Sequence, residues 1–417
     1  MIILANAMNF VVENLEKIIL FADFDIMRFM PRILHIGKYF PPFAGGMECF
    51  LADLMAAQTA QKNQVAALVH DHGFSSPFRS IQAESYQNHI VYRTPSYGRV
   101  LYAPISPHFP FWLNHVIRQW QPDILHFHLP NTSAFWALFL PQAKKLPWIL
   151  HWHSDVISSL NTGLSIAYYG YKPFEQSLLS RAQAVIATSP PYLASSRALQ
   201  TWQAKSHVIP LGIDLSRLPE SSADMLTWAK QQWQPNKMRL LAIGRLTYYK
   251  GYEVLIKAVA QLSGVQLFIV GKGEEKKLLE QLIKELNLTD KVRLLGYCEE
   301  KQLRALLISA DCLCLPSLER TEAFGVVLLE AMRYAKAIIA SNIVGSGVTW
   351  VVEAEKTGLL VSTGDATALA HAIQHLHDND ALRVTLGLAG QQRFFQQFDI
   401  TGVASKINEL YNITTKI

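Results

Sequence analysis

From residue 31 onward, short apolar runs alternate with longer segments of helical periodicity. The runs RILHIG, QVAALVH, DILHFH, WILHWH and AVIATS have the length of buried strands, and GGMECFLADLMAAQTAQ and FEQSLLSRA have helical spacing. After a break, RLLAIGR, VQLFIVG, VRLLG, CLCLPS and AIIAS continue the pattern, with helical segments such as EEKKLLEQLIKEL between them. Such alternation favours parallel sheets covered by helices. We therefore predict an α/β fold of two Rossmann-like domains that face each other across a cleft.

The alternation lapses at residues 209–225, IPLGIDLSRLPESSADM, where Pro, Gly, Asp and Ser accumulate as in a linker. We predict an N-terminal domain at residues 31–209, a linker at 210–236 and a C-terminal domain at 237–390. Residues 391–417 are expected to form a helical segment that packs back on the first domain. The length of 417 residues suits two or three domains.

Residues 1–30 precede the first expected strand. They lack a basic n-region, and charged residues interrupt their apolar stretch, so they make a poor signal peptide. Met27 and Met30 are alternative start sites, which leaves this extension either dispensable or a short amphipathic helix that touches a surface. No later window holds about 18 uninterrupted apolar residues, so we expect no transmembrane span.

Composition narrows the classes of function. Half of the residues are hydrophobic and 17% are charged, which excludes a disordered chain. The formal charge of +5 is too small and too scattered to indicate nucleic acid as a partner. The four cysteines form no C-x-x-C pair, and Cys312 and Cys314 fall on one face of an expected buried strand. Reduced core thiols of this kind suit a cytoplasmic protein.

Ligands in open parallel sheets bind at the carboxyl ends of the strands, so the loops there are the candidates for a site. Gly45 and Gly46 follow the first strand and precede a helix. They form either a tight turn or a backbone contact to a phosphate at the helix N-terminus.

Four histidines lie at the ends of two expected strands. His151 and His153 flank Trp152, and alternation sends them to the same side, which admits a metal pair, but no convincing third ligand is found. We expect His153 to act as a hydrogen-bond partner or proton handler. His126 and His128 are either similar or satisfied core imidazoles.

Two cations follow the first strand of the second expected domain. Arg245 and Lys250, in AIGRLTYYKGY, lie just before a helix, where they can bracket a diphosphate. The run IVGKGEE at 269–275 has only G-x-G and lacks the third glycine of a dinucleotide fingerprint, so it does not indicate a nicotinamide cofactor.

The stretch RTEAFGVVLLEAM places Glu322 and Glu330 eight positions apart around an apolar helical run. Along a helix this separation spans about 12 Å. Paired glycosidase carboxylates stand about 5 to 9.5 Å apart, so the spacing suits the two ends of one elongated ligand, such as a nucleotide sugar, better. The backbone N–H groups of Ala323, Phe324 and Gly325 can then face sugar or phosphate oxygens.

In this order, the motifs resemble those of the family-4 retaining glycosyltransferases with the GT-B fold, from about residue 31 to the C-terminus. They are Gly-Gly at 45–46, HSD at 153–155, IPLGID at 209–214, GRL and KG within 244–251, VGKGE at 270–274, PSLERTEAFG at 316–325 and the pair of glutamates. The resemblance implies that Gly46 contacts the donor phosphates and that Arg245 and Lys250 bind the leaving diphosphate. It also implies that His153 contacts the donor sugar, that Glu322 binds the sugar hydroxyls and that Glu330 binds the ribose. Tyr297, with its neighbours Gly296 and Cys298, is a candidate contact to the base.

The resemblance also implies a retaining hexosyltransferase without a cofactor or a metal. The D-x-D sequences at 23–25 and 378–380 do not lie in credible site loops. The sequences of these motifs are most similar to those of bacterial transferases that build surface polysaccharides, with a glycan or lipid-linked glycan as acceptor. GDP-mannose is the preferred donor, otherwise a UDP-glucose type. Trp112, His115 and Arg118 recur at helical spacing within residues 103–120. This face is a candidate for peripheral contact with the inner face of the plasma membrane. Ordinary packing of an aromatic-rich helix is the favoured alternative.

Two other functions remain open at this stage: a sugar-nucleotide 2-epimerase of the same fold, and a silent nucleotide-sugar-binding protein. One departure from the family pattern stands out. Ala335 and Ala337 occupy the Gly and Pro positions of the usual Gly-Lys-Pro step, where we expect a local backbone change with activity retained.

Overall fold

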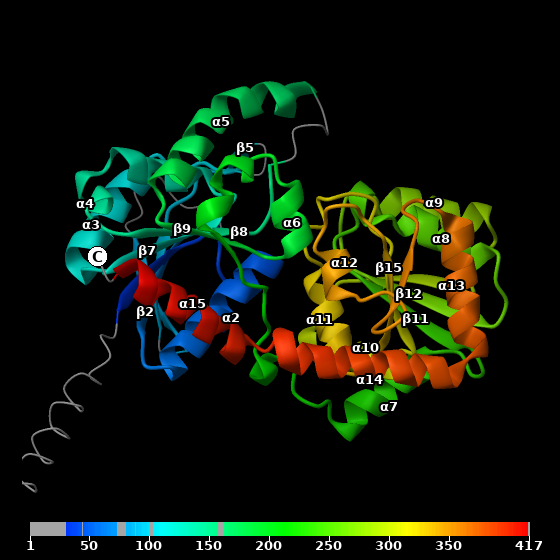
Figure 1. The fold of residues 1–417 in the computed structure, drawn as a ribbon. Coiled ribbons are helices and arrows are strands. Elements are labelled where there is room, and N and C mark those ends of the chain that lie inside the picture. The colour runs from blue at the N-terminus through cyan, green and yellow to red at the C-terminus, as the bar shows by residue number, and fades with distance from the viewer. Residues whose placement is uncertain are drawn as a thin grey trace, which may run out of the picture.

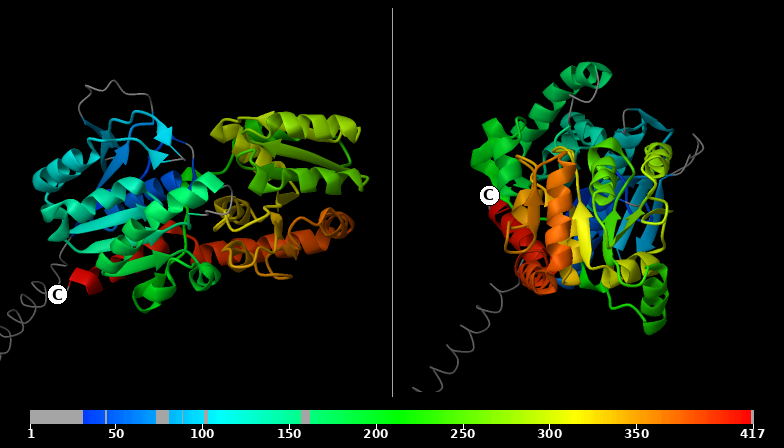
Figure 2. Two further views of the ribbon diagram at one scale, coloured as in Figure 1. Left: turned by 90° about the horizontal axis from the view of Figure 1, so that it is seen from above. Right: turned by 90° about the vertical axis from the view of Figure 1, so that its right-hand side faces the viewer.

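The computed structural model describes residues 31–43, 45–72, 81–87, 89–100, 103–156 and 162–415. The extension at residues 1–30, with its D-x-D sequence, lies outside this part of the chain. The described residues form two large sheets flanked by helices (Figure 1). Each sheet has its own helices, and the two units lie side by side in Figure 1 and in the left view of Figure 2, whereas the right view looks along the molecule with the second unit in front of the first.

The first sheet has the strand order β10-β9-β8-β7-β1-β2-β4-β3. Its strands are β1 (Arg32–Ile36), β2 (Gln64–His70), β3 (Gln82–Tyr86), β4 (His89–Thr94), β7 (Ile124–Leu129), β8 (Trp148–Trp152), β9 (Ala184–Ala187) and β10 (Ser206–Val208). Only β3 runs antiparallel to its neighbour. The register sets His35 of β1 beside His126 of β7, and His128 of β7 beside His151 of β8, so histidines of three adjacent strands share one region of the sheet.

The second sheet is parallel throughout, in the order β13-β12-β11-β14-β15-β16. Its strands are β11 (Met238–Ile243), β12 (Val265–Val270), β13 (Val292–Gly296), β14 (Cys312–Leu315), β15 (Ala337–Ser341) and β16 (Leu359–Val361). Cys312 and Cys314 are buried in β14 as free thiols, as their spacing predicts.

Helices cover both sheets. They are α2 (Gly46–Ala60), α3 (Phe109–Trp120), α4 (Pro141–Lys144), α5 (Thr162–Arg181), α6 (Pro190–Ser195), α7 (Ala223–Gln232), α8 (Tyr252–Ala260), α9 (Lys276–Glu285), α10 (Glu300–Ser309), α11 (Val326–Arg333), α12 (Val348–Val351), α13 (Ala366–Asp378), α14 (Asp380–Gln397) and α15 (Ile400–Thr415). Four 3-10 helices, η1 (Thr132–Phe139), η3 (Gln200–Lys205), η4 (Leu215–Arg217) and η5 (Tyr248–Lys250), and a small ribbon of β5 (Arg99–Val100) and β6 (Ala103–Pro104) complete the described elements.

The C-terminal chain connects the two units. Helix α14 lies along the second unit, and α15 lies beside α2 of the first (Figure 1). Where the chain passes between the units, the N–H of Ile213 donates to the carbonyl of Phe398 at 3.0 Å, and the N–H of Ile400 donates to the carbonyl of Ile213 at 3.3 Å. Helix α15 buries an apolar face that includes Ile407 and Tyr411, which supplies the driving force for this packing.

The strands expected from the apolar runs are all present. Strands β3, β4, β10 and β16 were not predicted from the sequence; β3, β10 and β16 are edge strands, and β4 lies between β2 and β3. Helix α3 buries Leu113, Val116 and Trp120, while Arg118 on the same helix is exposed. Packing therefore accounts for part of its aromatic character. Within the described residues, no helix has both the length and the apolarity that a membrane crossing requires.

Candidate active site

The strand order of the second sheet points to one edge as a binding site. Strands β12 and β13 extend from β11 on one side, and β15 and β16 extend from β14 on the other, so the order reverses between β11 and β14. Ligands of such sheets bind at the carboxyl ends of the strands beside this reversal. The loops that follow β11 and β14 are residues 244–251 and 316–325, the same loops that the sequence motifs indicate.

These two loops bring Lys250 and Glu322 together. Nζ of Lys250 lies 2.5 Å from Oε2 of Glu322, and the hydroxyl of Ser317 donates to the same oxygen at 2.9 Å. Both charged side chains are buried, 11% and 10% exposed. Burial alone lowers the pKa of Lys250, but the Glu322 carboxylate and Tyr249 together outweigh it, so that pKa is raised. Lys250 is therefore a buried cation, and this ion pair was not predicted from the sequence.

A glycine permits the close approach of the two loops. Gly251 has a φ of 66°, and a Cβ placed on it would lie 2.1 Å from the carbonyl oxygen of Pro316. Any other residue would push the loops apart. The K-G step of the sequence motif thus has a steric role beside its charge.

The loop after β14 presents backbone donors. The N–H groups of Ala323, Phe324 and Gly325 donate to no acceptor among the described residues, whereas the neighbouring carbonyls are used. The carbonyl of Ala323 accepts from the N–H of Gly347 at 2.8 Å, which holds the loop in place. Free donors ahead of a helix are suited to an anion or to hydroxyl oxygens.

Helix α11 begins at Val326, later than the expected start near Phe324, because Gly325 takes a φ of 79° as the residue before it. Glu322 therefore lies in a turn and only Glu330 lies on the helix. The estimate of about 12 Å between these glutamates assumed a continuous helix and does not apply.

Glu330 faces the linker and the first unit. Its carboxylate lies 3.9 Å from the guanidinium of Arg217, whose Nε donates to Asp53 of α2 at 3.1 Å. Burial raises the pKa of Glu330, although Arg217 opposes this. The side chain is 19% exposed, so it can still accept from a ligand hydroxyl.

The loop after β1 approaches α11 from the first unit. A Cβ on Gly46 would lie 3.3 Å from the Cγ2 of Val326, so the beginning of α2 lies against the beginning of α11. The carboxylate of Glu48 folds over Gly45, since a Cβ there would lie 2.1 Å from its Oε2. The phosphate contact expected at this helix start therefore has a carboxylate as its neighbour, which the sequence reasoning missed.

Cations surround Glu48. Burial raises the pKa of its carboxyl, while Lys38, Arg245 and Arg99 each lower it. Arg245, expected at the diphosphate, thus follows β11 of the second unit and acts on a carboxyl of the first unit through its charge. Lys38 lies two residues after the end of β1 and was detectable by that position, whereas nothing in the sequence around Arg99 marks it.

A second contact between the units involves the HSD segment. Asp155 accepts from Arg320 of the second unit at 3.0 Å, and also from Trp152 and Ser196 at 2.8 and 2.6 Å. The hydroxyl of Ser195 donates to the carbonyl of Gly345 nearby, at 2.8 Å. The carboxyl-end loops of the two sheets therefore meet.

His153 follows β8 in the same segment and is buried. Its Nε2 lies 3.0 Å from Nδ1 of His128, and burial lowers its pKa to about 3, so the ring is neutral. The rings of His151 and His153 stack at 4.3 Å, which confirms that they point to the same side of the strand. His128 is a hydrogen-bonded core imidazole, but His151 has no partner on either nitrogen among the described residues.

Tyr297 follows β13 and is 66% exposed, with Nζ of Lys272 lying 5.2 Å from its ring centre. Its position at the carboxyl end of a strand is the one expected of a base contact, and its ring is open to a ligand.

The arrangement defines a class of protein. Two Rossmann-like sheets whose carboxyl-end loops meet, with a buried Lys–Glu pair and free backbone donors at one of these edges, are the architecture of the two-domain GT-B fold.

Two family models match the chain. The model described as Glycosyltransferase Family 4 matches residues 44–217, and the model described as Glycosyl transferases group 1 matches residues 227–393. The O-antigen chain mannosyltransferase C of Escherichia coli is 26% identical over 385 residues, which cover 91% of this chain and 98% of the relative. The phosphatidyl-myo-inositol mannosyltransferase of Mycobacterium leprae is 28% identical over 394 residues, which cover 91% and 96%.

Solved structures agree with these matches. The sucrose-phosphate synthase from Thermosynechococcus elongatus superposes with a TM-score of 0.77 at 25% identity, covering 92% of this chain and 98% of that one. Anabaena HepE in complex with UDP-glucose has a TM-score of 0.69 at 22% identity, covering 92% and 99%. The chain belongs to the family-4 glycosyltransferases with the GT-B fold. The relatives named here are transferases or synthases, so they lend no support to the 2-epimerase alternative.

Proposed function

We propose that this glycosyltransferase moves a hexose from a nucleotide sugar to a glycan or lipid-linked glycan, with retention of anomeric configuration, during synthesis of a bacterial surface polysaccharide. Two kinds of relative favour this role: the O-antigen mannosyltransferase and the phosphatidyl-myo-inositol mannosyltransferase described above. The same two names favour mannose as the sugar. We propose GDP-mannose as its donor, with a UDP-glucose type as the alternative.

One observation carries the proposal: the buried pair of Lys250 and Glu322 lies beside the free N–H groups of Ala323, Phe324 and Gly325. A cation and backbone donors suit a diphosphate, and a carboxylate suits sugar hydroxyls. Both kinds of group at one sheet edge fit the junction between the diphosphate and the sugar of a nucleotide sugar.

The remaining site residues follow from this placement. Arg245, Gly45 and Gly46 approach the diphosphate from the boundary of the units, and His153 approaches the sugar. In this proposal Glu330, on α11, accepts from the ribose, and Tyr297, at the carboxyl end of β13, contacts the base.

Charge on the leaving diphosphate grows in the transition state, and fixed donors stabilise it without reorganisation. In this proposal Lys250 and Arg245 supply that stabilisation in place of a metal, so EDTA leaves turnover unchanged. The acceptor hydroxyl attacks the anomeric carbon from the side on which the diphosphate departs, and a phosphate oxygen takes its proton. Residues 103–120 remain our candidate for a peripheral membrane contact.

The test is a thermal-shift screen of GDP-mannose, UDP-glucose and ADP-glucose, followed by product analysis with the donor that raises the melting temperature. We expect one donor to stabilise the protein and the Glu322→Ala variant to abolish transfer while remaining folded. Full activity in Glu322→Ala would overturn the site, and an inverted anomer in the product would overturn retention.

A further inference from the structure

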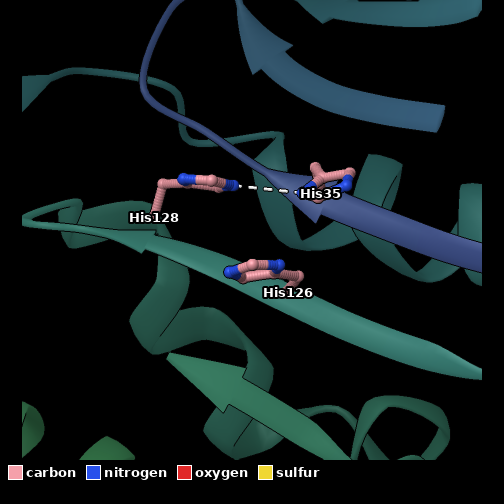
Figure 3. Close-up of side chains that lie close together, drawn as sticks. All are labelled: His35, His126 and His128. Atoms are coloured by element: carbon pink, nitrogen blue, oxygen red, sulfur yellow. Dashed lines mark hydrogen bonds between the residues drawn. The ribbon is translucent and has the colours of Figure 1, made fainter. Parts of the chain in front are cut away.

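Behind His153 the structure holds a continuous chain of hydrogen bonds that reaches the last helix. Three buried histidines, His35, His128 and His153, form the end of it that lies farthest from that helix. Nε2 of His35 lies 2.8 Å from Oε1 of Gln58, Nδ1 of His35 lies 3.1 Å from Nε2 of His128 (Figure 3), and Nδ1 of His128 lies 3.0 Å from Nε2 of His153. Each neutral imidazole has one donor and one acceptor nitrogen, so the direction of one bond fixes the direction of the next.

The three rings are neutral. Burial lowers the pKa of His35 to about 4 and that of His153 to about 3, and it lowers the pKa of His128 well below its ordinary value. None of them therefore carries the second proton that would break the alternation of donor and acceptor.

A backbone carbonyl on α15 sets the direction. Nε2 of Gln61 donates to the carbonyl of Thr401 at 2.9 Å and to the hydroxyl of Ser405 at 3.0 Å. That hydroxyl gives its own proton to the same carbonyl, so it must accept from Gln61. A flipped Gln61 amide would set two acceptors face to face, so its orientation is fixed.

The fixed orientation of this amide determines which atom donates and which accepts in each of the next hydrogen bonds toward His153. Oε1 of Gln61 accepts from Asn408, whose Oδ1 faces Nε2 of Gln58 at 3.3 Å. Oε1 of Gln58 is then left for His35, which must place its proton on Nε2. His128 must in turn donate from Nε2 to His35, and His153 must donate from Nε2 to His128.

The chain ends on an unused acceptor. With its proton on Nε2, His153 has a lone pair on Nδ1, and that buried atom has no partner among the described residues. We propose that helix α15, acting through α2 and the buried histidines, holds His153 in the Nε2–H tautomer so that Nδ1 accepts a hydrogen bond from a hydroxyl of the transferred sugar. The identity of the ligand rests on the proposed function, whereas the tautomer does not.

A metal site is the competing interpretation of these histidines. Ring nitrogens of His35, His126 and His128, and those of His128, His151 and His153, lie within 4.8 Å of one another. A metal ion must lie in the plane of each ring that binds it, because the lone pair lies there. Each group includes nearly parallel stacked rings, at 16° for His126 and His128 and at 7° for His151 and His153, so their lone pairs do not converge on one point.

The tautomer can be read directly from ¹⁵N NMR spectra of histidine-labelled full-length protein, because protonated and unprotonated ring nitrogens differ strongly in chemical shift. The wild-type protein is expected to show an unprotonated Nδ1 at His153, assigned by comparison with His153→Phe. The Gln58→Met variant removes the acceptor that orients His35 and should shift His153 toward the Nδ1–H form. The Asn408→Asp variant keeps an acceptor facing Gln58 and should leave His153 unchanged.

The ligand is tested with GDP-mannose and UDP-glucose donors that carry fluorine in place of one hydroxyl at a time, away from the reacting carbon. Fluorine cannot donate a hydrogen bond. One such donor should lose about tenfold or more in kcat/KM with the wild type, and Gln58→Met should reduce that discrimination, whereas Asn408→Asp should keep it.

Several outcomes overturn the inference. A protonated Nδ1 in the wild type, an unaltered His153 tautomer in Gln58→Met, or stoichiometric binding of Zn²⁺ to the histidines would each remove the hydrogen-bond chain. The wild-type spectrum tests the tautomer of His153 even if the variants fail to fold. If the tautomer is correct but no fluorinated donor is discriminated, the sugar contact fails while the chain stands. If neither nucleotide hexose is turned over, the proposed function fails instead.

Discussion

Nζ of Lys250 lies 2.5 Å from Oε2 of Glu322, and both side chains are almost fully buried. Removing one partner of such a pair leaves an uncompensated buried charge, which costs about 3 to 5 kcal/mol. We therefore expect Lys250→Met and Glu322→Gln each to lower the free energy of unfolding, Lys250→Met by the larger amount because a neutral glutamine can still accept a hydrogen bond. Urea denaturation measures both effects.

The double variant Lys250→Met/Glu322→Leu separates stability from function. With both charges gone, most of the lost stability should return. Transfer should remain abolished, because neither the cation nor the carboxylate is available to the donor. Recovery of activity together with stability would mean that the pair is only a structural contact.

The sequence indicated both members of this pair but not the contact between them. Each lies in a local motif, K-G for Lys250 and T-E-A-F-G for Glu322, and the position of each motif after an apolar strand can be recognised from the sequence alone. Their contact depends on β14 lying next to β11, and strand order is set by packing of the whole sheet rather than by local pattern. The histidine chain shows the same limit: alternation placed His151 and His153 on one side of a strand, but the neighbouring β7 and β1 supply the partners of His153 and His128.

Asp155 and Arg320 link the two units through a partly buried, charge-assisted hydrogen bond of 3.0 Å. Asp155 also accepts from Trp152 and Ser196, so Asp155→Ala takes the acceptor away from three donors, Arg320 included. We expect this variant to lose about 1.5 to 3 kcal/mol of stability, and to lose turnover because His153 lies two residues away. Thermal unfolding and steady-state kinetics are the measurements.

Lys257→Ala is the matched control. It removes an ion pair of 2.5 Å to Glu253 on α8, and both side chains are about half exposed, at 49% and 48%. Exposed pairs contribute about 1 kcal/mol or less, so stability and turnover should both stay close to those of the wild type. Equal losses in Asp155→Ala and Lys257→Ala would show that Asp155 has no special place at the junction.

Ala335 has a φ of 52°, a left-handed conformation that glycine adopts without penalty. Alanine stands here where the family usually has glycine, and the turn has a backbone conformation that suits glycine. The backbone change expected relative to the family stays a prediction. Relief of the left-handed penalty, less the extra entropy of an unfolded glycine, should make Ala335→Gly more stable by about 0.5 to 1 kcal/mol.

Its control is Ala337→Gly, at a buried position of β15 in the same helix-to-strand connection. Glycine there gains nothing in the backbone and should cost about 1 kcal/mol. Chemical denaturation of the two variants should therefore give opposite signs, and a loss of stability in Ala335→Gly would contradict the strain at that turn.

The buried histidines make the fold sensitive to mild acid. Burial lowers the pKa of His35 to about 4 in the folded state, against about 6.5 in the unfolded chain, and it lowers the pKa of His126, His128 and His151 in the same direction. Between these values the unfolded chain binds more protons than the folded one. Stability is therefore complete above about pH 6.5 and falls as the pH drops toward 4, by about 1.4 kcal/mol per pH unit for each such histidine.

His151 offers the sharpest test of this acid sensitivity, because neither of its ring nitrogens has a partner among the described residues. Replacing it by an apolar residue of similar volume removes a buried polar group that makes no hydrogen bond. At pH 7 we therefore expect His151→Leu to be at least as stable as the wild type, with a gain of up to about 1 kcal/mol. It also removes one group that must be protonated on unfolding in acid. The stability of His151→Leu should thus fall less steeply between pH 6.5 and pH 5, by about one proton in the slope. Urea denaturation across this range gives both quantities, and an unchanged slope would show that His151 does not titrate differently in the two states.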